Sequence, residues 1–206
     1  SNSSLCGGFN ANIIKMMQQV VNHYREAGVT DIVVYPIGRK AAEQAAKLGL
    51  TLAGDFTHLA EKPSAQVCAG IATELAGKFA RQEFDKVELI YHHFKSAGSQ
   101  ILTRRTFLPI DLSTEVGRYN DRDLSSNLVT AKAQEYLRKK RTSEEKKKDE
   151  AKPLNDNFIV EPDMKSILET LIPKELNLML YTALLDSNAS EHAARMVAMQ
   201  TATDNA

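Results

Sequence analysis

The residues best placed for chemistry near the start of the chain form the run Leu5-Cys6-Gly7-Gly8-Phe9-Asn10. Two glycines ahead of a helix start can let backbone amides hold a phosphate group. The run contains no G-x-G-x-x-G pattern and no Lys-Ser/Thr after the glycines, so it meets neither the dinucleotide nor the P-loop fingerprint. A tight turn is the favoured interpretation, and a phosphate- or nucleotide-binding loop at Cys6-Gly7-Gly8 is the alternative.

Cys6 lies beside a predicted helix start, where a thiol can act as a nucleophile or a redox centre. A nucleophile needs a general base and a group that orients that base. The sequence shows neither of these near Cys6. A small buried residue in a turn is therefore the favoured interpretation of Cys6.

The five histidines do not form a metal-binding pattern. His92 and His93 are neighbours on a predicted strand, so their side chains point to opposite faces. The others show no ligand spacing with a cysteine or a carboxylate pair: His23, His58 and His192. The sequence therefore predicts no catalytic residue, no metal and no cofactor.

Basic clusters at residues 138–141 and 146–148 could bind nucleic acid or anionic lipid. Acidic residues are interleaved with them: Glu144, Glu145, Asp149 and Glu150. Tyr136 is the one nearby aromatic side chain that could stack on a base. A solvated surface segment is favoured over a binding site, and no nucleic-acid partner is expected.

The composition agrees with a single domain that carries appendages. The chain has 206 residues, which is long enough to bury a substantial core, and its 26 basic residues balance 26 acidic ones. No window of about 18 apolar residues is present, so no transmembrane segment is expected. Two cysteines are too few for a disulfide framework and favour a reducing compartment.

Apolar periodicity predicts four helical regions. They run from an N-cap at Asn10 to a stop at Gly28, over residues 38–48, from Pro63-Ser64 onward, and from an N-cap at Asp163 to the end of the chain. Pro173 is expected to interrupt the last helix or to start a new one.

Strands are predicted at Ile32-Val33-Val34-Tyr35 within residues 31–37, and over residues 87–94, 101–110 and 158–160, with 87–94 and 101–110 joined as a hairpin. Residues 50–57 are expected to hold a short strand. The 87–94 strand is apolar on both faces and is expected at the centre of a sheet. The element order predicts an α/β fold: a three-layer sheet with helices on both faces, plus a long C-terminal helix stub. The loop at residues 1–8 is typical of a segment that follows a strand.

The pattern divides the chain into four parts. Residues 1–130 are expected to form the α/β globular domain and residues 131–156 a charged insertion, either mobile or a surface helix. Residues 157–162 would add the last strand of the globular domain. Residues 163–206 form the C-terminal helical region, interpreted as the start of a coiled-coil shaft.

The end of the chain carries a seam of residues at alternating steps of four and three: Leu185, Ala189, His192, Met196, Met199, Thr203 and Ala206. This spacing is typical of a coiled coil. The small and flexible side chains of the seam need a partner helix close by. The sequence offers no second long seam, so the partner helix is expected to be missing.

Three blocks resemble the gamma subunit of F-type ATP synthases. The segment from Ser190 to Met199, followed by Thr203-Asp204-Asn205-Ala206, resembles the start of that family's C-terminal helix. The Leu5–Asn10 run is similar to its loop between the first strand and first helix of the globular domain. The third block is Val160-Glu161-Pro162 with the apolar run that follows it. The chain departs from the family at Asn2-Ser3-Ser4, where an Asp, a basic residue and a Gly are usual, and in the longer charged insertion.

The resemblance implies a non-catalytic rotor subunit of the central stalk, which couples proton flow to ATP synthesis or hydrolysis by rotation. The implied partners are the alpha and beta subunits of the catalytic hexamer, the epsilon subunit, the membrane rotor ring and the chain's own missing N-terminal helix in an antiparallel coiled coil. The implied location is peripheral, on the cytoplasmic face of a bacterial plasma membrane. The resemblance also implies helix-contact residues at Ser190, Glu191, His192, Arg195, Met196, Met199, Asp204 and Asn205.

Overall fold

The computed structural model describes residues 1–110 and 161–205. The chain divides into one compact unit, Ser1–Pro109 with Leu168–Ala206, and a second, Ile110–Ile167. The predicted charged insertion at 131–156 and the predicted strand at 158–160 lie outside the described residues. The described elements are α1 (Phe9–Glu26), β1 (Val33–Val34), α2 (Arg39–Lys47), β2 (Thr51–Leu52), the 3-10 helix η1 (Thr57–Ala60), α3 (Ala65–Ala80), β3 (Val87–Ser96), β4 (Ser99–Leu108) and α6 (Met164–Asp204).

The described strands form two separate two-stranded sheets. Strands β1 and β2 pair in parallel, with Val33 opposite Thr51, whereas β3 and β4 form the predicted antiparallel hairpin. The mixed α/β class is confirmed, and the single three-layer sheet stays a prediction. The short strand predicted within residues 50–57 is confirmed at Thr51–Leu52, and the strand predicted at Ile32–Tyr35 is observed as Val33–Val34.

The first helix does not begin as the sequence predicted. Its N-cap is Gly8, and Asn10 lies inside the helix, so the prediction of Asn10 as N-cap is wrong. The Asn10 side-chain amide turns back instead and donates to the Ser3 carbonyl oxygen at 2.8 Å and to Cys6 Sγ at 3.1 Å. Asn10 therefore stabilises the preceding loop instead of capping the helix. The stop at Gly28 is confirmed, since Gly28 takes a φ of +85° just after α1.

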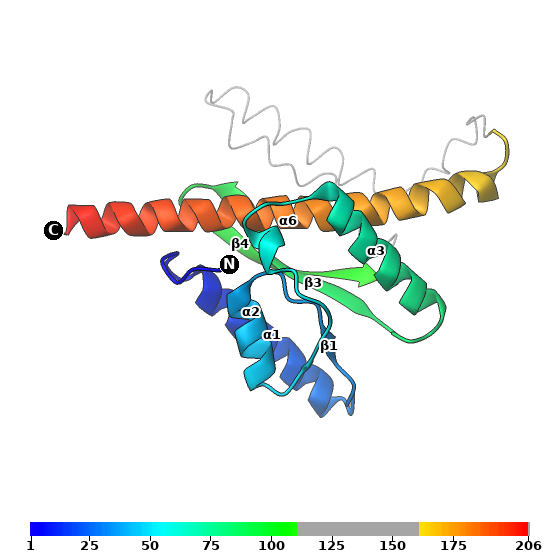
Figure 1. Ribbon diagram of the computed structural model, residues 1–206, viewed down its shortest axis with the longest axis horizontal. Helices are drawn as coiled ribbons and strands as arrows, with labels where there is room; N and C mark the ends of the chain where they lie inside the picture. Colours follow the sequence, from blue (N-terminus) through cyan, green and yellow to red (C-terminus); the bar gives the residue numbers. More distant parts are fainter. Residues whose placement is uncertain (111–160, 206) are drawn as a thin grey trace, which may run out of the picture. The chain divides into compact units, whose positions relative to one another are not determined.

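Helix α6 is continuous for 41 residues, and the predicted break at Pro173 is wrong. Pro173 removes one intrahelical hydrogen bond, but it is exposed, so water can replace that bond. The predicted N-cap is confirmed, because Asp163 Oδ1 accepts a hydrogen bond from the Ser166 amide at 3.0 Å. Figure 1 shows α6 as one long rod, with α3 and the β3–β4 hairpin against it.

The main core lies where α3, the hairpin and the middle of α6 meet. Burying these apolar side chains supplies most of the stability of the unit. The α6 contribution recurs at steps of three and four, as for one face of a helix: Leu176, Met179, Leu180 and Leu184. A second, smaller cluster joins α1 to α2 through Met17, Val21, Ala45 and Leu50.

Candidate functional site

An exposed stripe runs along α6 on the side away from the core. We call it the α6 stripe; its residues follow one another at alternating steps of three and four, and each is exposed: Leu168, Leu171, Glu175, Leu178, Thr182, Leu185, Ala189, His192, Met196, Met199 and Thr203. Its large apolar side chains expose 41% to 58% of their surface. At 1.5 Å per residue the stripe is about 53 Å long. The alternating three-four spacing of the stripe is the spacing that helices use in coiled-coil contacts.

The stripe is longer than the seam that the sequence predicted. The predicted seam began at Leu185. The same spacing continues back to Leu168 through the polar residues Glu175 and Thr182. The signal was therefore present in the sequence, but these two polar residues interrupt its apolar pattern. Ala206, the last predicted seam residue, lies outside the described residues.

The predicted helix-contact residues fall into two groups. His192, Met196 and Met199 lie on the exposed α6 stripe. Ser190 and Glu191, in contrast, are buried against the chain's own globular body. Beyond them, Asp204 accepts a hydrogen bond from Gln200 at 2.8 Å, and the Asn205 amide donates to the Thr201 carbonyl oxygen at 3.2 Å.

The inward-facing group is held by hydrogen bonds. Ser190 Oγ donates to the backbone carbonyl oxygen of His92 at 3.3 Å. Arg195 donates to Ser3 Oγ at 3.0 Å and forms a close ion pair with Glu191 one turn earlier on the helix. These contacts connect α6 with β3 and with the N-terminal loop.

The N-terminal loop also forms hydrogen bonds with α2 and with the segment around η1. Asn2 Oδ1 accepts a hydrogen bond from the Arg39 amide at 2.9 Å, at the first residue of α2. The Asn2 amide nitrogen donates to the Thr57 carbonyl oxygen at 3.1 Å and to Glu61 at 2.7 Å. Asn2 and Ser3, at the positions where the chain departs from the family pattern, thus make polar contacts here. The sequence carried no signal for the partners of these two side chains, which are 37 or more residues away from them.

The Cys6-Gly7-Gly8 loop does not assemble a catalytic centre. Cys6 is completely buried, and its thiol faces the Ser3 carbonyl oxygen at 3.7 Å and the Asn10 amide. Gly7 adopts a φ of +53°, in the left-handed region that glycine tolerates. The loop is thus a tight turn whose polar contacts are internal, which disfavours the phosphate-binding alternative.

His92 and His93 point to opposite sides of β3, as predicted. His92 is only 2% exposed, and its ring nitrogen Nδ1 has no hydrogen-bond partner among residues 1–110 and 161–205. Burial lowers the pKa of His92 to about 4, because the surroundings disfavour the charged imidazolium. His93 is exposed, and its Nδ1 lies 2.5 Å from Asp186 Oδ2 on α6.

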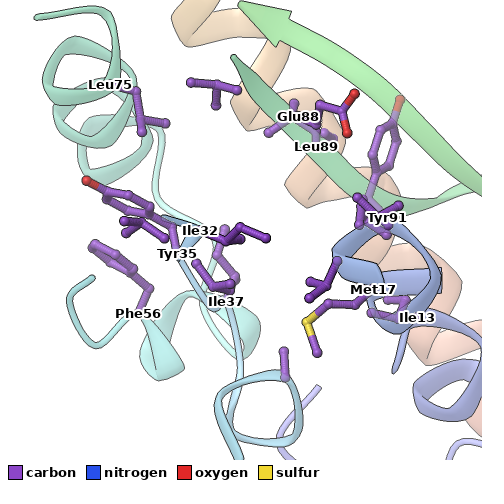
Figure 2. Close-up of a pocket in the computed structure, with 18 of the residues that line it drawn as sticks. Ile13, Met17, Ile32, Tyr35, Ile37, Phe56, Leu75, Glu88, Leu89 and Tyr91 are labelled. Atoms are coloured by element: carbon purple, nitrogen blue, oxygen red, sulfur yellow. The ribbon is translucent and has the colours of Figure 1, made fainter. Parts of the chain in front are cut away.

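A cavity of about 730 Å³ separates β1 from β3. Figure 2 shows Ile32 and Tyr35 on one side of it and Leu89 and Tyr91 on the other. The lining is continuous along both segments, over residues 28–35 and 83–91. Because alternate residues of a strand face opposite sides, a continuous lining means that strand edges border the cavity.

Residues 1–110 and 161–205 contain no group of three or more His, Cys, Asp or Glu side chains arranged to hold a metal ion. None of the helices in these two ranges combines the length and apolar character needed to cross a bilayer.

Comparison with known proteins shows which family the chain belongs to. The family described as ATP synthase matches residues 1–206. ATP synthase gamma chains of Phocaeicola vulgatus and Bacteroides fragilis are each 44% identical over 206 residues, which is 100% of this chain and 61% of theirs. The chain therefore spans less than two thirds of the length of these curated relatives.

A solved structure shares the fold. It is a chain in the cryo-EM structure of the Tetrahymena thermophila mitochondrial ATP synthase, described as central stalk and c-ring. The match has a TM-score of 0.60 and 22% identity, and covers 98% of this chain and 73% of the other. Since the family match extends over the whole chain, the chain belongs to the ATP synthase family, and its curated relatives are gamma chains.

Proposed function

We propose that this chain is the globular body and the beginning of the shaft of a rotor subunit in the central stalk of an F-type ATP synthase. The subunit would couple proton flow through the membrane rotor ring to ATP synthesis or hydrolysis by turning inside the alpha-beta hexamer. It would be non-catalytic itself, because shaft action requires stiffness and shape instead of perturbed active-site groups. The observation that carries the proposal is the exposed α6 stripe, which extends from Leu168 to Thr203, on a member of this family.

The proposed partner of the stripe is an N-terminal helix of the same protein, in an antiparallel coiled coil. Leu185, Met196 and Met199 would supply apolar knobs, while the small Ala189 would let the helices approach closely. His192, Asp204 and Asn205 would contribute to the same contact or to contacts with the hexamer. Residues 163–206 would thus form the base of the shaft.

We also propose that the globular body is completed by one more strand, from the segment that precedes Ser1 in a longer chain. Among the described strands, β1 pairs only with β2 and β3 only with β4, and the cavity between them is bordered by strand edges. A strand residue in a packed sheet occupies about 160 Å³, so a cavity of about 730 Å³ has room for roughly four to five residues. Such a strand would join the two sheets into the three-layer fold, with β3 inside it.

The globular body and the charged segment also have proposed places in the complex. Residues 1–130 and 157–162 would form the body that meets the epsilon subunit and the rotor ring, with the charged segment at 131–156 as an insertion. The complex would hold the subunit peripherally on the cytoplasmic face of a bacterial plasma membrane.

The central test is assembly. A full-length chain should co-purify with the alpha-beta hexamer, and Met196→Asp should weaken this complex because it buries an unpaired charge in the coiled coil. Val197→Asp is the matched control, since Val197 is also exposed but lies off the stripe. Failure of the full-length chain to bind the hexamer would refute the rotor proposal.

The strand proposal has its own readout. Backbone amides of β1 and β3 should exchange with solvent more slowly in a full-length chain than in the 206-residue chain, because an inserted strand pairs with both edges. Equal exchange rates in the two chains would show that the cavity does not receive a strand.

A further inference from the structure

Helix α6 is attached to the globular body in two zones. The first zone, from Leu176 to Leu184, is apolar and packs into the main core. The second zone, from Asp186 to Arg195, is attached by hydrogen bonds and ion pairs. Apolar burial is non-directional, whereas hydrogen bonds depend on distance and angle. The second zone is therefore the part of the attachment that can define how α6 is rotated about its own axis.

One flank of this zone faces β3. Asp186 Oδ2 lies 2.5 Å from His93 Nδ1, and one turn later Ser190 Oγ donates to the His92 carbonyl oxygen at 3.3 Å. Ser190 is completely buried. Two successive turns of α6 are thus joined to adjacent residues of one strand.

The other flank faces η1 and the N-terminal loop. The Asn188 side chain donates to the Ala60 carbonyl oxygen at 2.9 Å, and two turns later Arg195 donates to Ser3 Oγ at 3.0 Å. Arg195 is also fixed by its ion pair with Glu191, so its guanidinium is held in place toward the loop.

The two flanks lie on different sides of the helix. At about 100° per residue, Asp186 and Ser190 are separated by about 40° and Asn188 and Arg195 by about 20°, while the two pairs are about 170° apart. The α6 stripe lies between them on the outward side. A rotation or a slide of α6 would break contacts on both flanks at once, in addition to disturbing the packing of the apolar zone.

We propose that Asp186, Asn188, Ser190 and Arg195 are positioning residues that lock the rotation and axial register of α6 on the globular body. The lock holds the α6 stripe at one angle and carries torque from the body into the shaft. The torque part of this proposal rests on the proposed rotor function. The locking part does not, because it concerns only the angle of α6 on its own body.

The lock can be tested in the 206-residue chain by the distance between two spin labels. Labels at Met199→Cys on α6 and Lys47→Cys at the end of α2 occupy exposed positions, while the native Cys6 and Cys68 are fully buried and protected from labelling. Ser3→Ala with Asn188→Ala removes one flank and keeps the Glu191–Arg195 pair. Asp186→Ala with Ser190→Ala removes the other. Gln200→Ala is the control, because the Gln200 side chain donates its hydrogen bond to Asp204 of the same helix and not to the globular body.

The expected result is the loss of a single narrow distance in both double variants and its retention in the control, with the helix content unchanged in circular dichroism. An unchanged distance in both double variants would overturn the lock, whatever the function of the protein. If one double variant fails to fold, the other decides the result.

The torque part needs a full-length chain in the assembled complex. There the double variants should retain ATP hydrolysis but lose proton pumping per ATP, a ratio that a merely structural role would leave unchanged. Normal pumping in variants with a freed helix would overturn torque transfer through these residues. Failure of the unmodified full-length chain to assemble would refute the rotor function instead, and the spin-label result would still decide on the lock.

Discussion

The imidazole ring of His92 stacks on the phenyl ring of Phe9, with ring centroids 4.4 Å apart and an interplanar angle of 27°. Phe9 is the first residue of α1 and His92 lies in the middle of β3, so the stack joins the N-terminal helix to the hairpin. Ser190 of α6 bonds to the carbonyl oxygen of the same histidine. One buried ring therefore lies where three elements meet.

The burial of His92 makes stability depend on pH. The pKa of His92 falls from 6.5 to about 4 on burial, so the unfolded chain binds a proton more readily than the folded chain. The contribution of neutral His92 is fully present above pH 6.5 and is lost as the pH falls toward 4. The loss should reach up to about 3 kcal/mol in the free energy of unfolding, measured by urea denaturation at each pH. His92→Phe keeps an aromatic stack and should flatten this part of the profile; a profile identical to that of the unmodified chain would contradict the assignment.

The inward face of α6 should carry far more stability than the outward face. Leu180 is 5% exposed within the main core, and Leu178, two residues earlier, is 55% exposed. Leu180→Ala should lower the free energy of unfolding by about 2–5 kcal/mol through lost burial and a cavity. Leu178→Ala should change it by less than about 0.5 kcal/mol in the same denaturation experiment. Similar losses for the two variants would show that the helix packs at a different angle.

Two glycines should respond to alanine in opposite directions. Gly54 has a φ of +72°, and an added Cβ would lie 2.7 Å from the Phe56 ring. Gly54→Ala should therefore cost about 1–2 kcal/mol. Gly70 lies within α3 with open space around the position of a Cβ, so Gly70→Ala should stabilise the chain by about 0.5–1 kcal/mol. Thermal unfolding of the two variants would measure the contrast, and a destabilising Gly70→Ala would mean that this surface of α3 is covered.

Pro173 offers a test of the continuity of α6. Pro173→Ala restores a backbone N–H inside the helix and should raise the free energy of unfolding by about 1–2 kcal/mol, after the greater freedom of the unfolded chain is subtracted. Hydrogen exchange around residue 173 should slow in parallel. If stability did not rise, α6 would already bend or open at this position in solution.

The sequence predicted the elements whose signals are local. The helix start at Pro63-Ser64, Asp163 as the N-cap of α6 and the β3–β4 hairpin are all confirmed, because caps and short turns depend on neighbouring residues. The same reasoning failed at Asn10, whose side chain is drawn to the Ser3 carbonyl oxygen by the fold of the preceding loop. It failed again at Pro173, where packing of the following turns stabilises a helix across the proline.

By itself, the sequence determined the family resemblance, the mixed α/β class and the four-three spacing at the end of the chain, since these depend on residue order alone. Only the tertiary structure decided which side of α6 faces inward. Helical spacing places residues on a common face but does not say what that face contacts, and burial depends on elements far away in the sequence. In the structure, Ser190 and Glu191 are buried against the globular body. His192, Met196 and Met199, in contrast, lie on the outward stripe.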